Sequence, residues 1–518
     1  MKVWTREVLS EFVRTKLDGY RFIVVSNREP FQHRHSPDGH IECIQPASGM
    51  ASALDPVMRA CGGLWIAHGS GDADRQTVDA LDHVQVPPEE PEYTLRRVWL
   101  TKKEEEGYYA GLSNQGLWPL CHVAFTRPMF DPDQWATYRR VNERFAEAVL
   151  EEAGGDPTFV FIQDYHFALL PRMLRRARSN LVIAQFWHIP WPNREVFSAF
   201  PWREEILDGL LGNDLLGFHL PHHCQNFHAT VDCSIEARVD EAGSEICYGG
   251  HCTHVKPFPI GIDFDEHADL SESAEVAKHM RQWRRELSLE GRLLGMGVDR
   301  LDYTKGIPER LRFLDRLLEL NPGYRGKLVF VQIAVPSRST LPAYRQIENE
   351  VEALTAQINL RWGTPGWRPV ILLKRHSPQP EMIALHRLAQ FCVVSSLHDG
   401  MNLVAKEFVA SRVDEDGVLV LSKFAGAARE LKDALQINPF SVEEGAEAYR
   451  CALEMHPEER RRRMERMRET VEQNNVYRWA GKFVSELSKV QFPESIEREN
   501  SLSAGRAAFS AAELEVAV

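Results

Sequence analysis

Short apolar runs recur along the chain, and each run ends in a group of polar or charged residues. Continuous apolar runs of this length indicate strands that are buried on both faces. The segments between several of them have apolar residues at helical spacing. Strands that alternate with helices predict parallel sheets covered by helices, which is a doubly wound α/β fold. The predicted strands are residues 21–25, 159–162, 182–186, 215–220, 293–298, 327–334, 370–373, 389–397 and 417–421.

The length of the chain predicts more than one of these sheets. A chain of 518 residues is too long for one ordinary hydrophobic core, so we expect two domains of comparable size. Proline and glycine punctuate residues 256–263, and we place the boundary near Asp263.

Composition limits the classes of partner that we expect this protein to bind. The net charge of -13 argues against nonspecific binding to nucleic acid or to anionic membranes, so anionic ligands would need locally concentrated cations. Nine cysteines without paired or zinc-type spacing favour reduced thiols and no metal site. No apolar run approaches the roughly 20 residues that cross a bilayer. We therefore expect a cytoplasmic protein.

A charged loop follows the predicted strand at residues 293–298. Arg300 and Lys305 lie in this loop, and Pro308 and Glu309 suit the first turn of the next helix. Ligands of parallel sheets collect beyond the carboxyl ends of strands. There Arg300 could donate two hydrogen bonds to the oxygens of one phosphate, and Lys305 could add a second positive charge. The alternative is that both cations only pair with Asp299 and Asp302.

A second loop of this kind follows the predicted strand at residues 389–397. It ends in Asp399-Gly400, and Asn402 is a good N-cap for a helix. The first free amides of that helix, those of Leu403 and Val404, would suit a diphosphate. Glu407 lies one turn further on, where it could accept hydrogen bonds from a ribose. The alternative is an ordinary turn followed by an ordinary surface glutamate.

Three long segments closely resemble one family. They are VDRLDYTKGIPERL, HDGMNLVAKEFVASR and VLVLSKFAGAARELKDALQINPF, and the resemblance runs from about residue 22 to about residue 487. The family is that of the trehalose-6-phosphate synthases, retaining glucosyltransferases of the GT-B type. The resemblance implies transfer of glucose from a nucleotide sugar to the anomeric hydroxyl of glucose 6-phosphate. It also implies two Rossmann-like domains that face each other across a cleft.

The family organisation extends to the domains. Residues 1–263 would form the acceptor-binding domain and residues 264–476 the nucleotide-sugar domain. Residues 477–492 would form a helix that crosses back to the first domain. The tail at residues 493–518 is rich in Ala, Ser and Glu, and we expect it to be disordered.

The resemblance implies a donor site. A glycine pair closes a loop over the donor in the family, whereas this chain has Ser48-Gly49. Ser377 stands near the base, where the family usually has an apolar or aromatic residue, so the preferred base stays open among uridine, adenosine and guanosine. The implied catalytic residues are Arg300, Lys305, Asp399, Glu407 and His188. The implied donor-binding residues are Ser48, Gly49, His188, Arg300, Lys305, Ser377, Asp399, Gly400, Met401, Asn402, Leu403, Val404, Ala405 and Glu407.

The implied acceptor site draws on other strand ends. Arg28 would bind the acceptor phosphate, although it could instead pair with Glu29. By themselves, Tyr109 and Trp118 would be core aromatics more often than ligand-binding residues. Family matches place both in the acceptor pocket, with Asp164 on the acceptor hydroxyls and Arg338 on its phosphate.

The implied chemistry needs neither a metal nor a cofactor. Attack would occur on the face from which the leaving group departs, and the leaving phosphate would take the acceptor proton. Asp399 would hold glucose hydroxyls without attacking. We read Asp72 and Asp74, like Asp131 and Asp133, as turn residues. The expected partners are the small-molecule substrates, and homo-oligomerisation stays open.

Four alternatives remain at this stage. Arg28-Glu29-Pro30 resembles glucosylglycerol-phosphate synthases, which would change only the acceptor, and a cyclitol-coupling pseudo-glycosyltransferase is a related case. A glycosidase could use Asp164 and Asp399 as its acid and base. A sugar-phosphate sensor would bind without catalysis.

Overall fold

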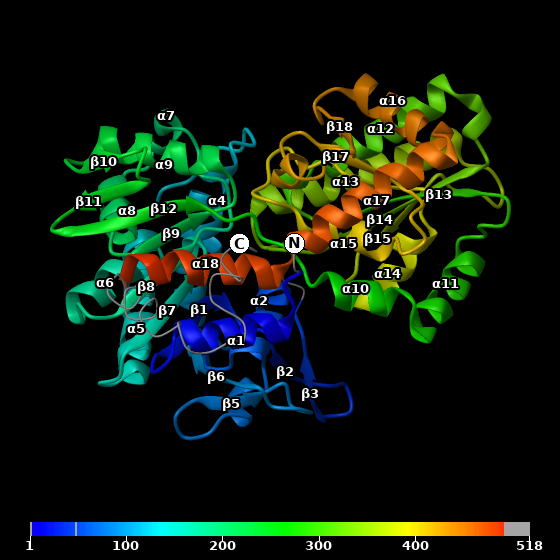
Figure 1. Ribbon diagram of the computed structural model, residues 1–518. Coiled ribbons are helices and arrows are strands. Elements are labelled where there is room, and N and C mark those ends of the chain that lie inside the picture. The colour runs from blue at the N-terminus through cyan, green and yellow to red at the C-terminus, as the bar shows by residue number, and fades with distance from the viewer. Residues whose placement is uncertain (1–2, 47–48, 492–518) are drawn as a thin grey trace, which may run out of the picture. The chain divides into compact units, whose positions relative to one another are not determined.

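The computed structural model describes residues 3–46 and 49–491 and contains two compact units. Among these residues, the first unit comprises the chain up to Ile260 together with Val476–Gln491, and the second is Gly261–Asn475 (Figure 1). We expected the boundary near Asp263. Ser48, an implied donor-binding residue, lies outside the described residues. The tail from residue 493, which we expected to be disordered, also lies outside them.

The sheet of the first unit has ten strands in the order β10-β11-β12-β9-β8-β7-β1-β4-β6-β5. Pairing is parallel from β12 through β6, and the outer strands pair antiparallel. The order reverses at β1, whose neighbours are β4 and β7, so ligands are expected beyond the ends of β1 and β7. The strands are β1 (Arg21–Arg28), β4 (Leu64–His68), β5 (His83–Val86), β6 (Tyr93–Val98), β7 (Thr158–Gln163), β8 (Val182–Phe186), β9 (Leu215–Phe218), β10 (Arg238–Asp240), β11 (Glu245–Tyr248) and β12 (His251–Pro257), with a separate hairpin of β2 (Gln32–His35) and β3 (Ile41–Ile44).

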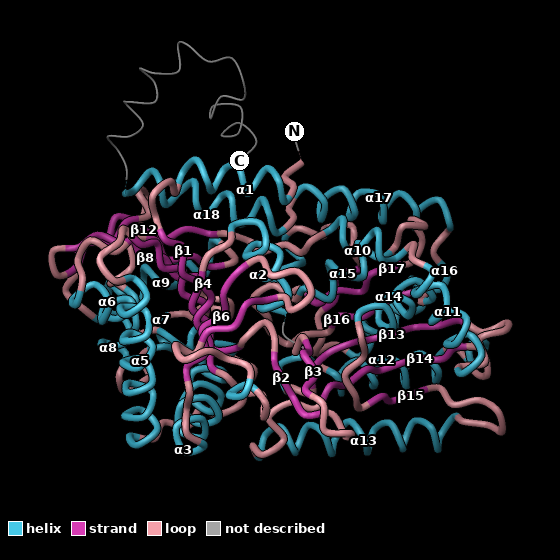
Figure 2. The backbone as a smooth tube through the Cα atoms, turned by 90° about the horizontal axis from the view of Figure 1, so that it is seen from below, coloured by secondary structure: helices cyan, strands magenta, loops and turns pink. Residues whose placement is uncertain are grey.

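The last described helix belongs to the first unit. α18 (Val476–Gln491) contacts α1 (Arg6–Lys16) and α2 (Gly49–Cys61), and α1 and α18 run side by side in Figures 1 and 2. Phe483 packs its ring against Phe161 and Phe186, which ties this distant segment to the sheet. The remaining helices are α3 (Lys102–Glu105), α4 (Trp118–His122), α5 (Pro132–Ala153), α6 (Leu170–Ala177), α7 (Arg194–Phe197), α8 (Arg203–Leu210), α9 (Pro221–Ser234), the π-helix η2 (Glu106–Leu117) and the 3-10 turns η1 (Asp74–Gln76) and η3 (Tyr165–Phe167).

The sheet of the second unit has six parallel strands in the order β15-β14-β13-β16-β17-β18. Its order reverses between β13 and β16, and helices cover both of its faces (Figure 2). The strands are β13 (Leu293–Arg300), β14 (Leu328–Val335), β15 (Val370–Leu373), β16 (Phe391–Val394), β17 (Val418–Ser422) and β18 (Leu435–Ile437). The helices are α10 (Phe264–Ser271), α11 (Ala274–Glu286), α12 (Ile307–Leu320), α13 (Pro342–Trp362), α14 (Gln379–Leu388), α15 (Leu403–Ser411), α16 (Val442–Glu454) and α17 (Pro457–Gln473), with 3-10 turns η4 (Tyr303–Lys305), η5 (Pro322–Tyr324) and η6 (Gly426–Arg429).

The predicted doubly wound α/β architecture is confirmed, and each of the nine predicted apolar runs contains a strand. None of the described helices is both long and apolar enough to span a bilayer.

The expectation of reduced thiols is wrong for one pair of cysteines. Cys247 and Cys252 form a disulfide, with their Cα atoms 4.0 Å apart. The two residues lie directly opposite each other in the β11–β12 hairpin, because its turn falls at Gly249-Gly250. A separation of five residues in the sequence did not reveal this register.

Candidate active site

Three cations surround one buried carboxylate at the carboxyl ends of β13 and β14. Asp302 has no exposed side-chain surface, and its Oδ2 accepts a hydrogen bond from Arg338 Nη1 at 3.4 Å. Burial by itself would raise the pKa of Asp302. Arg338, Arg300 and Lys305 outweigh that effect and lower the pKa below its usual value. The cluster therefore keeps Asp302 ionised.

Tyr344 is another hydrogen-bonding partner of Arg338. The Tyr344 hydroxyl lies 2.6 Å from Arg338 Nη1 and 3.3 Å from Asp302 Oδ2. Both partners restrict the rotation of the Arg338 guanidinium. We infer that this arginine is held in place before any anion binds.

Asp399 is the hydrogen-bonding partner of Lys305. The lysine Nζ lies 2.5 Å from Asp399 Oδ2, and Ser396 Oγ and Asn402 Nδ2 donate to the same oxygen, each at 3.2 Å. The loops after β13 and β16 meet here, at the reversal of strand order. Asp399 is thus oriented by three donors, and the alternative in which Lys305 pairs only with Asp299 and Asp302 is wrong.

The predicted N-cap of α15 is confirmed. The side chain of Asn402 accepts a hydrogen bond from Ala405 N at 3.3 Å, and its backbone has a φ of 73°. Leu403 and Val404 form the start of the first turn, where a helix has N–H groups without acceptors of its own. Gly400 and Met401 are buried just before it. This helix start can therefore donate to an anion.

Glu407 lies one turn further along α15 and is half-buried. Burial raises the pKa of this carboxyl, and His267 of α10 opposes that shift. Ser377 is buried between β15 and α14, and Gly49 begins α2 in the first unit. The implied roles of these three residues in donor binding stay predictions.

Asp299 belongs to a structural ion pair. Arg310 is fully buried, and its Nη2 lies 2.6 Å from Asp299 Oδ2. The same guanidinium donates to Gln332 Oε1 at 3.0 Å and to Ser395 Oγ at 3.1 Å. These contacts connect β13, β14 and the end of β16. Asp299 therefore has Arg310 as its ion-pair partner, and this buried pair helps to hold the sheet together.

In the first unit, Arg28 at the end of β1 contacts Tyr109. Its Nη2 donates to the Tyr109 hydroxyl at 2.7 Å, and its guanidinium lies 5.8 Å from the ring centroid. The alternative in which Arg28 pairs with Glu29 is wrong, because Glu29 Oε2 lies 2.9 Å from Arg97 Nε. Arg28 therefore bonds a tyrosine hydroxyl and not the neighbouring carboxylate.

A chain of contacts links Arg28 to the ends of β7 and β8. The Tyr109 ring stacks on His166, with centroids 5.7 Å apart and planes inclined by 16°. Asp164 has a φ of 73°, and its carboxylate accepts a hydrogen bond from the His188 amide at 3.2 Å and lies 3.8 Å from His166 Nδ1. Arg28, Tyr109 and Asp164, three of the predicted acceptor residues, therefore lie near one another at the reversal of strand order in the first unit.

Trp118 is buried at the start of α4 and belongs to the same group. Its ring lies 4.0 Å from His122 and 6.0 Å from Tyr165, measured between centroids, and Tyr165 in turn lies 4.1 Å from His166. Only 6% of Trp118 is exposed. Trp118 therefore packs against the other aromatic residues of this group and exposes little surface of its own.

His188 is kept neutral by its surroundings. Burial, followed by the charges of His219 and His166, lowers the pKa of His188 well below its usual value. Its Nε2 lies 2.9 Å from Gln163 Oε1, and His219 Nε2 lies 3.0 Å from the His188 backbone oxygen. A neutral imidazole suits an uncharged sugar hydroxyl better than a phosphate.

Sequence reasoning assigned no role to His166 or His219. His166 stacks on the predicted Tyr109, and His219 fixes the backbone of the predicted His188. Both follow the carboxyl ends of strands, β7 and β9. The rule that selected Asp164 and His188 could have found them.

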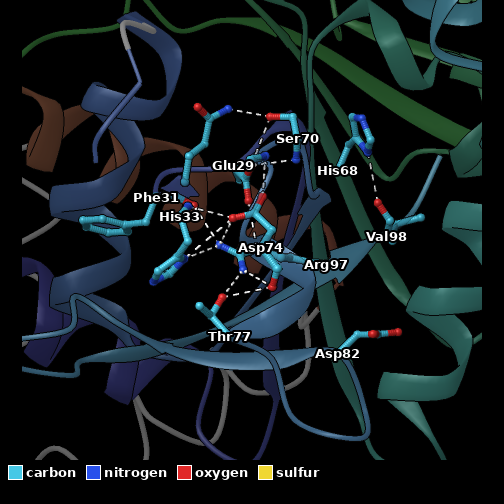
Figure 3. A network of polar contacts seen from close by, with 12 residues as sticks. Glu29, Phe31, His33, His68, Ser70, Asp74, Thr77, Asp82, Arg97 and Val98 are labelled. Atoms are coloured by element: carbon cyan, nitrogen blue, oxygen red, sulfur yellow. Dashed lines mark hydrogen bonds and ion pairs between the residues drawn. The ribbon is translucent and has the colours of Figure 1, made fainter. Parts of the chain in front are cut away.

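Directly after Arg28 in the sequence, a buried polar network holds the segment between β1 and β2 in place (Figure 3). Arg97 of β6 bonds Glu29 at 2.9 Å and Asp74 at 2.8 Å, and its guanidinium also donates to the Phe31 carbonyl at 3.2 Å. Ser70 N donates to Glu29 at 2.9 Å. The reading of Asp74 as a turn residue therefore misses its buried role, whereas Asp131 does cap α5.

Two carboxylates share this one guanidinium. Burial and the charge of Asp74 raise the pKa of Glu29 to about 8. Burial would also raise the pKa of Asp74, but hydrogen bonds from His33 and Glu29 lower it to about 2. Between these values the pair carries one negative charge and one proton.

We predict that Glu29→Gln changes how stability depends on pH. Glu29 has a folded pKa of about 8 and an ordinary value of 4.5, so between them the folded state binds a proton that the unfolded state lacks. This group's contribution to stability therefore falls as pH rises through that window. Denaturant unfolding of both proteins between about pH 5 and pH 8 should show a smaller fall in the variant. Parallel profiles would contradict the protonation of Glu29.

Solved structures of trehalose-phosphate synthases resemble this structure. One, an α,α-trehalose-phosphate synthase from Burkholderia xenovorans in complex with glucose-6-phosphate, is 33% identical, covers 90% of this chain and 99% of its own, and has a TM-score of 0.81. Another, described as trehalose-6-phosphate from E. coli bound with UDP-2-fluoro glucose, is 33% identical, covers 90% and 99%, and has a TM-score of 0.80. The two α/β units thus have the GT-B glycosyltransferase fold.

The chain belongs to glycosyltransferase family 20, whose model matches residues 20–489. A trehalose-6-phosphate synthase of Mycobacterium sp. (strain KMS) is 40% identical over 474 residues, covering 90% of this chain and 95% of its own length. The trehalose-6-phosphate synthase of Mycolicibacterium smegmatis is 39% identical over 475 residues, covering 90% and 92%.

Proposed function

We propose that this chain is a retaining α,α-trehalose-6-phosphate synthase. It transfers glucose from a nucleotide sugar such as UDP-glucose to the anomeric hydroxyl of glucose 6-phosphate. The observation that carries this proposal is the gathering of Arg300, Lys305 and Arg338 around Asp302, beside the start of α15. The family and the relatives described above support the same reaction.

The second unit binds the donor. The positive charge of Arg300 and Lys305 and the amides of Leu403 and Val404 neutralise the charge that grows on the leaving diphosphate. Glu407 accepts hydrogen bonds from the ribose. The buried Ser377 stands near the base. Because these groups are already in place, little reorganisation is needed as the bond breaks.

The first unit binds the sugar of the acceptor. Arg28, which is bonded to the neutral Tyr109, provides a full positive charge for the phosphate. Asp164, which is fixed by the His188 amide, accepts hydrogen bonds from the sugar hydroxyls. The family match also assigns Arg338 to the acceptor phosphate, and this assignment stays a prediction. Trp118 closes the apolar side of this group.

The chemistry proceeds without an enzyme nucleophile. The bond from glucose C1 to the diphosphate oxygen breaks, and a bond forms from C1 to the acceptor oxygen on the same face. The acceptor proton moves to the leaving phosphate oxygen. Asp399 has one oxygen committed to three donors, which suits a group that holds glucose hydroxyls better than one that attacks carbon. We propose that Arg300 and Lys305 stabilise the leaving diphosphate without a metal ion.

A single assay tests the reaction. Purified protein is incubated with UDP-, ADP- or GDP-glucose, with and without glucose 6-phosphate, and nucleotide release and the disaccharide product are measured. We expect nucleotide release that requires the acceptor, together with α,α-trehalose 6-phosphate. Glucose release without an acceptor would indicate a glycosidase, and binding without turnover would indicate a sensor. Either result would overturn the proposal.

The alternative acceptor, glycerol 3-phosphate, rests on Arg28-Glu29-Pro30. Glu29 is buried and bonded to Arg97, so a structural role in this network explains why a glutamate stands at this position. Replacing glucose 6-phosphate with glycerol 3-phosphate in the same assay separates the two reactions. We expect the first acceptor to support faster turnover.

We predict that Arg28→Ala mainly weakens use of the acceptor. Loss of a charged hydrogen bond to a phosphate should raise the KM for glucose 6-phosphate by about tenfold or more, since such bonds contribute roughly 1.5–3 kcal/mol. The KM for the nucleotide sugar should change little. Steady-state kinetics with each substrate varied in turn measures both. An unchanged acceptor KM would remove Arg28 from the phosphate site.

A further inference from the structure

The β11–β12 hairpin gathers four side chains with metal-ligating atoms on one face. Glu245 lies opposite His254, and Cys247 lies opposite Cys252. The two pairs are separated by two residues along each strand, so all four side chains project from the same face. The hairpin stands near the edge of the first sheet, where only β10 lies beyond it.

Three of the four ligand atoms lie close together, and the imidazole of His254 lies beside one of them. A carboxylate oxygen of Glu245 and the Sγ atoms of Cys247 and Cys252 all lie within 4.8 Å of one another. His254 Nε2 lies 3.7 Å from Glu245 Oε2. The side chains of Glu245 and His254 are 27% and 23% exposed, so an ion can reach them from solvent. Among the residues that the structure describes, no other three His, Cys, Asp or Glu side chains bring their ligand atoms this close together.

We propose that the reduced form of this hairpin binds a divalent cation of the zinc class through Glu245, Cys247, Cys252 and His254. Two thiolates, one imidazole and one carboxylate form a four-ligand set that suits tetrahedral zinc. Cross-strand neighbours lie close enough for both sulfurs to contact one ion after small side-chain rotations. The disulfide and the metal site are mutually exclusive, because each uses the same two sulfur atoms.

The exchange between the two forms is balanced. A dithiol reductant gives two electrons and two protons to the Cys247–Cys252 bond and becomes a disulfide itself. Metal binding then releases the two thiol protons to solvent. Two thiolates and a carboxylate carry three negative charges, and the divalent cation supplies two positive charges. Arg238 of β10, which lies 2.9 Å from Glu245 and 3.2 Å from Cys247 Sγ, supplies the third.

This site lies away from the residues of the proposed reaction. His254 pairs with Leu215 at the start of β9, whereas His219 follows the end of that strand. Because β9 and β12 are parallel, the four ligands lie toward the opposite end of the sheet from Arg28, Asp164 and His188. Metal binding can therefore be measured whether or not the proposed reaction is correct.

Metal titration of the full-length protein tests the proposal. One sample is reduced with a phosphine, freed of reductant without air and titrated with Zn²⁺ against a chromophoric chelator. A second sample keeps the disulfide. Co²⁺ titration adds a thiolate charge-transfer absorption that reports sulfur ligation directly. We expect one equivalent to bind to the reduced protein and none to bind at this site in the oxidised protein.

Variants assign the ligands. Cys247→Ser should abolish the cobalt–thiolate absorption of a two-sulfur site and weaken zinc binding. His254→Gln should weaken zinc binding by at least about tenfold, because even groups that only orient a ligand contribute that much. Cys233→Ser removes another exposed thiol and should bind as the wild type does. Circular dichroism checks that each variant is folded. Absence of zinc binding in the reduced protein, or unchanged binding in Cys247→Ser or His254→Gln, overturns the proposal.

Discussion

Lys305→Ala is expected to lose at least about 2 kcal/mol of transition-state stabilisation, or roughly 30-fold in kcat/KM for the nucleotide sugar. The lysine Nζ is held 2.5 Å from Asp399 at the reversal of strand order in the second sheet. Its charge is most useful when the diphosphate departs, because negative charge then grows on the bridging oxygen. The loss should therefore fall on kcat as well as on KM.

The measurement is steady-state release of the nucleoside diphosphate at saturating glucose 6-phosphate. Lys327→Ala is a matched control, because Lys327 is exposed just before the start of β14, at the other end of the sheet. Arg300→Ala should behave like Lys305→Ala. Turnover near that of the wild type in Lys305→Ala would remove this residue from the proposed mechanism.

Arg310→Ala is expected to destabilise the protein by about 3–5 kcal/mol, because it leaves the buried Asp299 carboxylate without its partner. The guanidinium has no exposed surface and bonds Asp299, Gln332 and Ser395 on three strands or strand ends. Burial already raises the pKa of Asp299, against the opposing charge of Arg310. Without that charge the carboxyl must take up a proton or stay ionised at high cost.

Denaturant unfolding followed by tryptophan fluorescence measures this loss. Arg312→Ala on the same helix is the control, because Arg312 and its ion-pair partners Glu309 and Glu350 are all partly exposed, so a much smaller change is expected. An Arg310→Ala variant as stable as the control would contradict a structural role for the Arg310–Asp299 pair. Together with Lys305→Ala, this variant separates charges that hold the sheet from charges available to a ligand.

The same distinction shows what could be predicted from sequence. Apolar periodicity and turn chemistry are local, and they placed residues 182–186 and 370–373 within the bounds that β8 and β15 have. Asn402 could be recognised as an N-cap because capping involves only its own helix. The rule that polar groups follow strand ends selected Arg28, Asp164, Asp399 and Lys305. The role of each residue toward a ligand stays a prediction.

The sequence by itself placed nine of the strands, several polar groups at their ends and the motifs of the family. Only the tertiary structure decided which opposite charges meet. Lys305 bonds Asp399, which lies 94 positions away, whereas the nearer Asp299 is committed to Arg310. The Cys247–Cys252 pair likewise depends on the register of one hairpin. Ion pairing and disulfide formation depend on distance in space, and strand order and register set that distance only when the chain has folded.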